Sequence, residues 1–216
     1  MKKFMLIPTC FLFVLSLFFI TPQDIYAYGY GLRGKDTLVA VYENIIAAIQ
    51  SNDYKSIQSE VKIIEVPLSN YLNYYGINLK PALSKGIKDK SPDIIVATIE
   101  QLIYFAVREK IYWNIKDELE KFVATKARLK VIFQYYTVLK PKIIKSDQEN
   151  NTKYKKEILD LIMGMKNTLG TAGAFGYNAK PPNLKEFTRL SSRLEKVLVL
   201  IFPHFKEGYG AKINPH

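Results

Sequence analysis

Two pairs of carboxylates have the residue types and the spacing that acid–base chemistry requires. Asp117 and Glu120, like Glu157 and Asp160, lie three residues apart, so each pair shares one face of a helix. Two carboxyl groups can divide the acid and base roles, or cleave a glycosidic bond, when their surroundings separate their pKa values. Lysines flank both pairs, however, and such stretches are typical of exposed, ion-paired surfaces. We therefore assign no catalytic residue and expect that the protein is not an enzyme.

The sequence contains no metal-binding motif. A di-iron bundle needs Glu-x-x-His on two helices, a zinc hydrolase needs His-Glu-x-x-His, and neither pattern occurs in this chain. The two histidines, His204 and His216, lie near the carboxyl terminus, and the single cysteine, Cys10, lies in an apolar amino-terminal run. We expect no metal site and no cofactor.

A glycine-rich stretch from Gly170 to Gly176 has the composition of a nucleotide-binding loop but not its context. No strand pattern precedes it, it lacks Gly-Lys-Ser/Thr, and it follows a helical segment instead of opening one. Gly170 is expected to end that helix, because helix ends favour glycine in the left-handed conformation. We interpret the stretch as an interhelical loop whose Phe175 and Tyr177 are available to a partner.

The tyrosine content is the one positive indication of binding. The chain has 15 tyrosines, several of them clustered, and tyrosine is enriched where protein surfaces meet. Packing in the core is the competing explanation for the tyrosines that fall in helical segments. With the two aromatic residues of the glycine-rich loop included, the predicted partner contacts are Tyr28, Tyr30, Tyr71, Tyr74, Tyr75, Phe175, Tyr177 and Tyr209.

Apolar residues recur at helical spacing through most of the chain. From Leu38 to Ile49 they follow steps of four, three and four, and the segment from Ile57 to Leu68 repeats this rhythm. Ser51-Asn52-Asp53 separates the two segments, which indicates a helical hairpin. Gly76 and Pro81 then predict a bend or a short helix over residues 69–81. No segment has the alternation of a strand.

Residues 91–93, Ser-Pro-Asp, are typical of a helix start. The following residues to Leu139 contain no glycine or proline, which predicts one long helix or two helices with a break at 113–117. Pro141 is expected to end this span, and residues 145–153 to form a polar loop. Glu100 and Arg108, in apolar surroundings on this span, either face solvent or find partners. The fold prediction is all-α: a single domain, residues 37–205, forming a bundle of five or six helices.

The amino terminus has the order of a secretory signal peptide. Two lysines precede an apolar run from Phe4 to Ile20, and a polar stretch ends at the small residue Ala27. We predict a signal peptide at residues 1–27, a flexible arm at 28–36 and a flexible tail at 206–216. An uncleaved anchor is the alternative for the apolar run. Export to the periplasm or the extracellular space is the expected localisation.

The charge of the chain is strongly positive and consists mostly of lysine. The net charge is +11, and five arginines stand among 31 basic residues. Lysine is a hydrated point charge suited to open surfaces, so the excess indicates a solvated face, or attraction to an acidic partner or an anionic membrane. Nucleic acid is not expected as a partner of an exported protein.

These observations predict an exported, non-enzymatic helical protein that acts as an interaction, scaffold or accessory subunit of a larger periplasmic or extracellular assembly. The partner is another protein or a second copy of the chain. The alternative is a periplasmic helical bundle that binds a ligand or a metal. A weaker alternative is a peripheral binder of anionic membrane surfaces.

Overall fold

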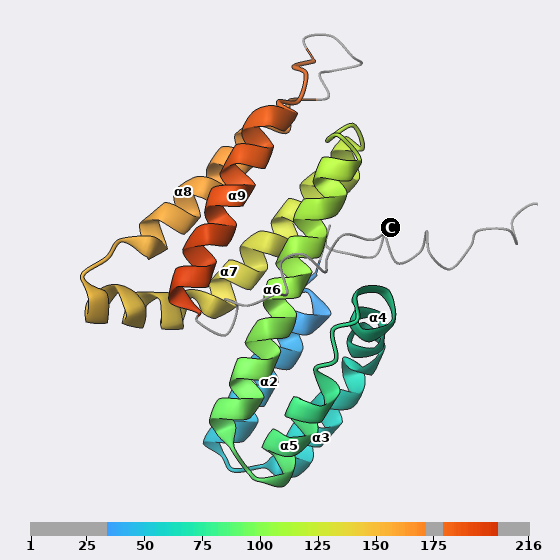
Figure 1. Ribbon diagram of the computed structural model, residues 1–216, viewed down its shortest axis with the longest axis vertical. Helices are drawn as coiled ribbons and strands as arrows, with labels where there is room; N and C mark the ends of the chain where they lie inside the picture. The colour runs from blue at the N-terminus through green and yellow to red at the C-terminus, as the bar shows by residue number, and fades with distance from the viewer. Residues whose placement is uncertain (1–33, 172–178, 203–216) are drawn as a thin grey trace, which may run out of the picture.

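The computed structural model describes residues 34–171 and 179–202, and this part of the chain is helical (Figure 1). The all-α prediction is therefore confirmed, with eight helices in the described ranges instead of five or six. Their bounds are α2 Thr37–Gln50, α3 Tyr54–Ile63, α4 Glu65–Tyr75, α5 Lys80–Lys88, α6 Pro92–Lys116, α7 Phe122–Asn150, α8 Tyr154–Asn167 and α9 Leu184–Ile201. The predicted signal peptide, residues 28–33 of the predicted arm and the predicted tail lie outside the described residues.

Two prolines account for the additional helices in the first half of the chain. The segment expected as one helix around Ile57 to Leu68 divides at Ile64, so that Pro67 falls in the first turn of α4, where its missing N–H is tolerated. Gly76 ends α4 with a left-handed φ of 66°. Pro81 does not break a helix but lies in the first turn of α5.

The long span after Ser91 forms two helices, α6 and α7, joined by a tight turn at residues 117–121. Glu118 and Leu119 take left-handed φ values of 48° and 62°, and the side chain of Leu119 is buried. The expected end at Pro141 and the expected polar loop at residues 145–153 are both wrong, because α7 continues to Asn150 and leaves only residues 151–153 before α8. Buried side chains on both sides of Pro141, including Leu139 and Ile143, hold the helix together despite its lost hydrogen bond.

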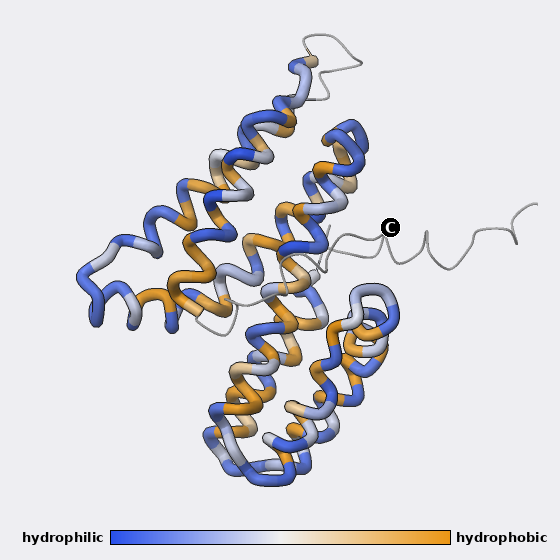
Figure 2. The backbone as a smooth tube through the Cα atoms, in the orientation of Figure 1, coloured by the Kyte–Doolittle hydropathy of each residue, from blue (hydrophilic) through white to orange (hydrophobic). Residues whose placement is uncertain are grey.

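The long helix α6 runs through the middle of the molecule (Figure 1). Helices α2 and α5 pack against it, α3 packs against α2 and α5, and α7 and α9 also contact α6. Helix α8 lies between α7 and α9. One core of buried apolar residues receives side chains from all eight helices. Figure 2 shows hydrophobic and hydrophilic positions alternating along each of these helices.

The residues that precede α2 are hydrogen-bonded to a side chain of α7. Asp36 caps α2 by accepting a hydrogen bond from the backbone N–H of Leu38 at 2.9 Å. The side chain of Gln134 accepts from the Asp36 backbone N–H at 2.8 Å and donates to the Gly34 carbonyl at 3.1 Å. The last residues of the predicted arm, 34–36, therefore lie against the bundle.

Among the described residues, none of the helices combines the length and the apolar character that a membrane span requires.

Candidate functional site

A groove with a volume of about 660 Å³ lies between the first half of α7 and the last turns of α8. Its walls are the beginning of α7 and the end of α8. At this end of the bundle, α8 and α9 diverge from α6 and α7 (Figure 1). The lining of the groove is mostly apolar. The apolar residues come from α7, from α8 and from the segment just after α8: Phe122, Val123, Ala127, Leu129, Phe133, Ile162, Met163 and Leu169.

The periodicity of α7 builds one wall of this groove. A single face of α7 carries Phe122, Leu129 and Phe133. Beside this face lie two more apolar residues, Val123 and Ala127, which make the apolar surface wider. Leu129 and Ala127 are buried and form the floor, whereas Val123 is 58% exposed and Phe133 is 42% exposed. The apolar face of α7 is therefore wider than the core covers.

Helix α8 supplies the opposite wall in the same manner. Ile162 and Leu169 are buried, while the neighbouring Met163 is 43% exposed. Methionine is flexible and polarisable, and it adapts to the shape of whatever packs against it. The groove thus has a buried floor and two rims of exposed apolar side chains.

Three lysines surround the apolar lining: Lys126 and Lys130 on α7 and Lys166 on α8. All three are exposed, and within the described ranges none of them forms an ion pair. The Lys126 ammonium lies 5.8 Å from the ring centroid of Phe122. The edge of the groove is therefore positively charged.

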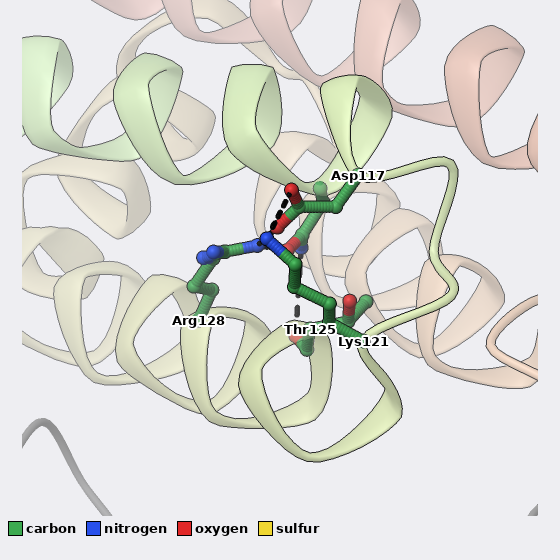
Figure 3. Close-up of polar contacts among 5 residues, drawn as sticks. Asp117, Lys121, Thr125 and Arg128 are labelled. Carbon is green, nitrogen blue, oxygen red and sulfur yellow. Dashed lines mark hydrogen bonds and ion pairs between the residues drawn. The ribbon is translucent and has the colours of Figure 1, made fainter. Parts of the chain in front are cut away.

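A polar network fixes the turn that positions the start of the groove (Figure 3). The Asp117 carboxylate accepts hydrogen bonds from Arg128 at 2.7 Å and from Lys121 at 3.0 Å. Arg128 also donates to the buried Asn114 at 3.3 Å, and the Asn114 amide points to the backbone carbonyl of Thr125 at 3.5 Å. Burial by itself would raise the pKa of Asp117, but the hydrogen bonds from Arg128 and Lys121 outweigh it and hold that pKa below its usual value.

The carboxylate pairs that suggested acid–base chemistry are mostly engaged in ion pairs. Asp117 belongs to the network just described, while Glu157 pairs with Arg193 of α9 at 2.6 Å. Asp160 pairs with Lys156 at 2.6 Å. These three carboxylates thus link helices or neighbouring helical turns.

Glu100 and Arg108 do not pair with each other, and each meets a different helix. Glu100 is 1% exposed and accepts a hydrogen bond from Lys142 of α7 at 2.5 Å. Burial raises the pKa of Glu100, while the hydrogen bonds from Lys142 and Tyr42 oppose that rise. Burial, together with the negative charge of Glu100, raises the pKa of Tyr42 to about 12. Arg108 pairs with Glu195 of α9 at 2.7 Å.

The predicted tyrosine contacts fall into two environments on α4. Tyr71 and Tyr75 are buried, with ring centroids 5.5 Å apart, and the Tyr71 hydroxyl donates to Glu109 at 3.2 Å. Core packing explains these two residues. Tyr74 is 67% exposed and remains available to a partner. The other predicted contacts lie outside the described residues: Tyr28, Tyr30, Phe175, Tyr177 and Tyr209.

Sequence reasoning did not find the groove. The spacing of Phe122 and Phe133 is that of an ordinary core-facing helix stripe, and spacing alone does not reveal whether a face is covered. The sequence does hold one signal for the groove: an apolar residue lies beside the core-facing stripe of each helix. These residues are Val123 on α7 and Met163 on α8.

Over residues 34–171 and 179–202, no three histidine, cysteine, aspartate or glutamate side chains converge as metal ligands would. His204 and His216 lie outside these ranges. In comparisons with known proteins, the chain matches no family model, no curated protein and no solved structure.

Proposed function

We propose that this chain is an exported, non-enzymatic interaction protein, an accessory or scaffold subunit that docks a protein partner in the groove between α7 and α8. The observation that carries the proposal is the exposure of Val123, Phe133 and Met163 around a preformed apolar floor. The order of the amino-terminal residues supports export to the periplasm or the extracellular space.

The energetics of the groove favour a partner. Fully burying a valine, phenylalanine or methionine side chain stabilises by about 1.5–3 kcal/mol. The three rim residues are each about half exposed, so covering them contributes about 1 kcal/mol per side chain. Phenylalanine and methionine are also among the residues enriched in the centres of protein interfaces.

Ligand binding is the second candidate, because the groove volume lies within the range of small-molecule sites. Such sites enclose most of the ligand surface. Here Val123 and Met163 lie on open rims, so a slender ligand would stay exposed along one side. A protein surface, which covers both rims at once, fits this shape better.

The proposal is tested by capturing partners from the native envelope and culture fractions with the wild-type protein and with Phe133→Glu. A charge at this position prevents an apolar surface from closing over the groove, so we expect capture to fall at least tenfold, on the order of the loss of one interface hot spot. Because the Phe133 ring is already 42% exposed, the variant should fold, which a melting curve checks.

Leu200→Glu is the matched control, since Leu200 is 56% exposed on α9 and does not line the groove. We expect this variant to capture the same partner as the wild-type protein. Equal capture by Phe133→Glu, or a wild-type protein that remains a lone monomer and captures nothing, would contradict the proposal.

A further inference from the structure

We infer that the occupant of the groove is an acidic amphipathic helix, about three turns long, that belongs to a different protein. This inference rests on the proposed function and names the chemistry of the partner.

The shape of the groove fits a helix. The lining on α7 extends from Phe122 to Phe133, which at 1.5 Å per residue is about 16 Å, or three helical turns. The opposite wall is the last part of α8 and the residue Leu169. Two adjacent helices with an open apolar seam accept a third helix that inserts its side chains between theirs. The matching partner has apolar residues at i, i+3, i+4 and i+7.

The charge around the groove specifies the flanks of that helix. Lys126 and Lys130 are one turn apart on α7, and Lys166 faces them from α8. In the part of the chain that the structure describes, these ammonium groups have no carboxylate partner. Carboxylates on either side of the apolar stripe of an incoming helix would supply that partner, and they would guide the docking orientation.

The charge at the groove edge favours a different protein over a segment of this chain or a second copy of it. The residues outside the described ranges contain only two acidic side chains, Asp24 and Glu207, so they lack the negative charge that would pair with the three lysines. A second copy carries the same net charge of +11, and two such molecules repel each other. A partner with excess negative charge is attracted instead.

The test uses a display library of peptides of about 16 residues, roughly four helical turns. Each peptide carries the apolar stripe, and its flanking positions are randomised among Glu, Lys, Ser and Ala. The library is selected on the purified full chain and, in parallel, on the Phe133→Glu variant. We expect peptides with Glu on the flanks to be enriched at least tenfold on the wild-type protein relative to the variant.

The charge requirement is then measured with one synthetic peptide from the selection. We expect Lys126→Glu/Lys130→Glu to weaken binding of this peptide about tenfold at low salt, because each exposed ion pair between the peptide and the groove edge contributes only modestly to the affinity. A peptide with Lys at the same flanking positions should recover most of that loss on this variant. Leu200→Glu should bind the selected peptide with unchanged affinity.

Several outcomes would overturn the inference: no preference for Glu on the flanks, equal enrichment on Phe133→Glu, or binding of the fatty acid oleate without binding of any peptide. A dimer of the wild-type protein that Phe133→Glu abolishes would also overturn it, in favour of a second copy. If capture of the native partner still depends on Phe133 while the library shows no acidic preference, the inference fails and the proposed function stands. If neither depends on Phe133, both fail.

Discussion

Replacing Gly170 by alanine will lower the free energy of unfolding by about 3 kcal/mol. Gly170 has a φ of +73°, and a side chain in this left-handed region costs about 1 kcal/mol. An added Cβ atom would also lie 2.2 Å from the carbonyl oxygen of Lys180. Thr171 and Lys180 exchange two backbone hydrogen bonds, at 3.0 and 3.2 Å, and displacing this bridge costs about 1 kcal/mol per bond.

Gly76→Ala is the matched control for this prediction. Gly76 has a similar φ of +66°, but an added Cβ atom would meet nothing within 4 Å. We expect it to lose only the cost of the left-handed backbone, about 1 kcal/mol. Urea unfolding followed by circular dichroism measures both variants. Equal losses would show that the close approach of Gly170 to the Lys180 backbone does not constrain the chain after α8.

Replacing Lys142 by methionine will destabilise the protein by about 2 kcal/mol near neutral pH. Lys142 is the cation that compensates the buried Glu100 carboxylate. Removing one member of a buried ion pair costs about 3–5 kcal/mol. The cost is smaller here because the Lys142 side chain is 42% exposed and the Tyr42 hydroxyl still hydrogen-bonds to the carboxylate.

The destabilisation by Lys142→Met will depend on pH, because burial raises the pKa of Glu100 in the folded protein above its ordinary value of 4.5. The folded state therefore binds the Glu100 proton more tightly than the unfolded state does. The contribution of this group to stability is fully present below pH 4.5 and is lost as the pH rises through the folded pKa. Removing the Lys142 cation raises that pKa further, so the variant loses stability over a wider range of pH.

Urea unfolding of the wild-type protein and of Lys142→Met across this pH range measures the effect. The double variant Glu100→Gln/Lys142→Met should regain most of the lost stability, because it has no buried charge. Lys145→Met removes a lysine that is 75% exposed and should change stability by less than about 0.5 kcal/mol. A destabilisation by Lys142→Met that is the same at all pH values would contradict this role of Glu100.

Most helices were predictable from the sequence because two signals agree on where each helix lies: the spacing of its apolar residues and the types of residue at its ends. Asp53 caps α3 within the polar Ser-Asn-Asp turn that separates the two predicted helices. Gly170 has the expected left-handed backbone, but α8 ends at Asn167 with Thr168 as its cap, so Gly170 follows the helix end and does not form it. Prolines were harder to interpret, since the same residue can begin a helix, as Pro81 does, or be tolerated within one, as Pro141 is. Which of these occurs depends on packing with distant helices, which spacing does not reveal.

The candidate site was not predictable for the same physical reason. Three tyrosines lie close together on α4, at positions 71, 74 and 75, yet only Tyr74 faces solvent. Phe122 and Phe133 continue an ordinary core stripe, and the groove forms only because α8 leaves part of that stripe uncovered. Burial of this kind depends on how helices meet in three dimensions.

The most direct test of the central claim is photo-crosslinking from within the groove. A photoreactive phenylalanine analogue is placed at position 133, or at position 200 as the control, in protein expressed in its native host. We predict that position 133 crosslinks to one acidic protein through a helical segment and that position 200 does not. Identical adducts from both positions, or none at position 133, would contradict the claim that this groove docks a partner.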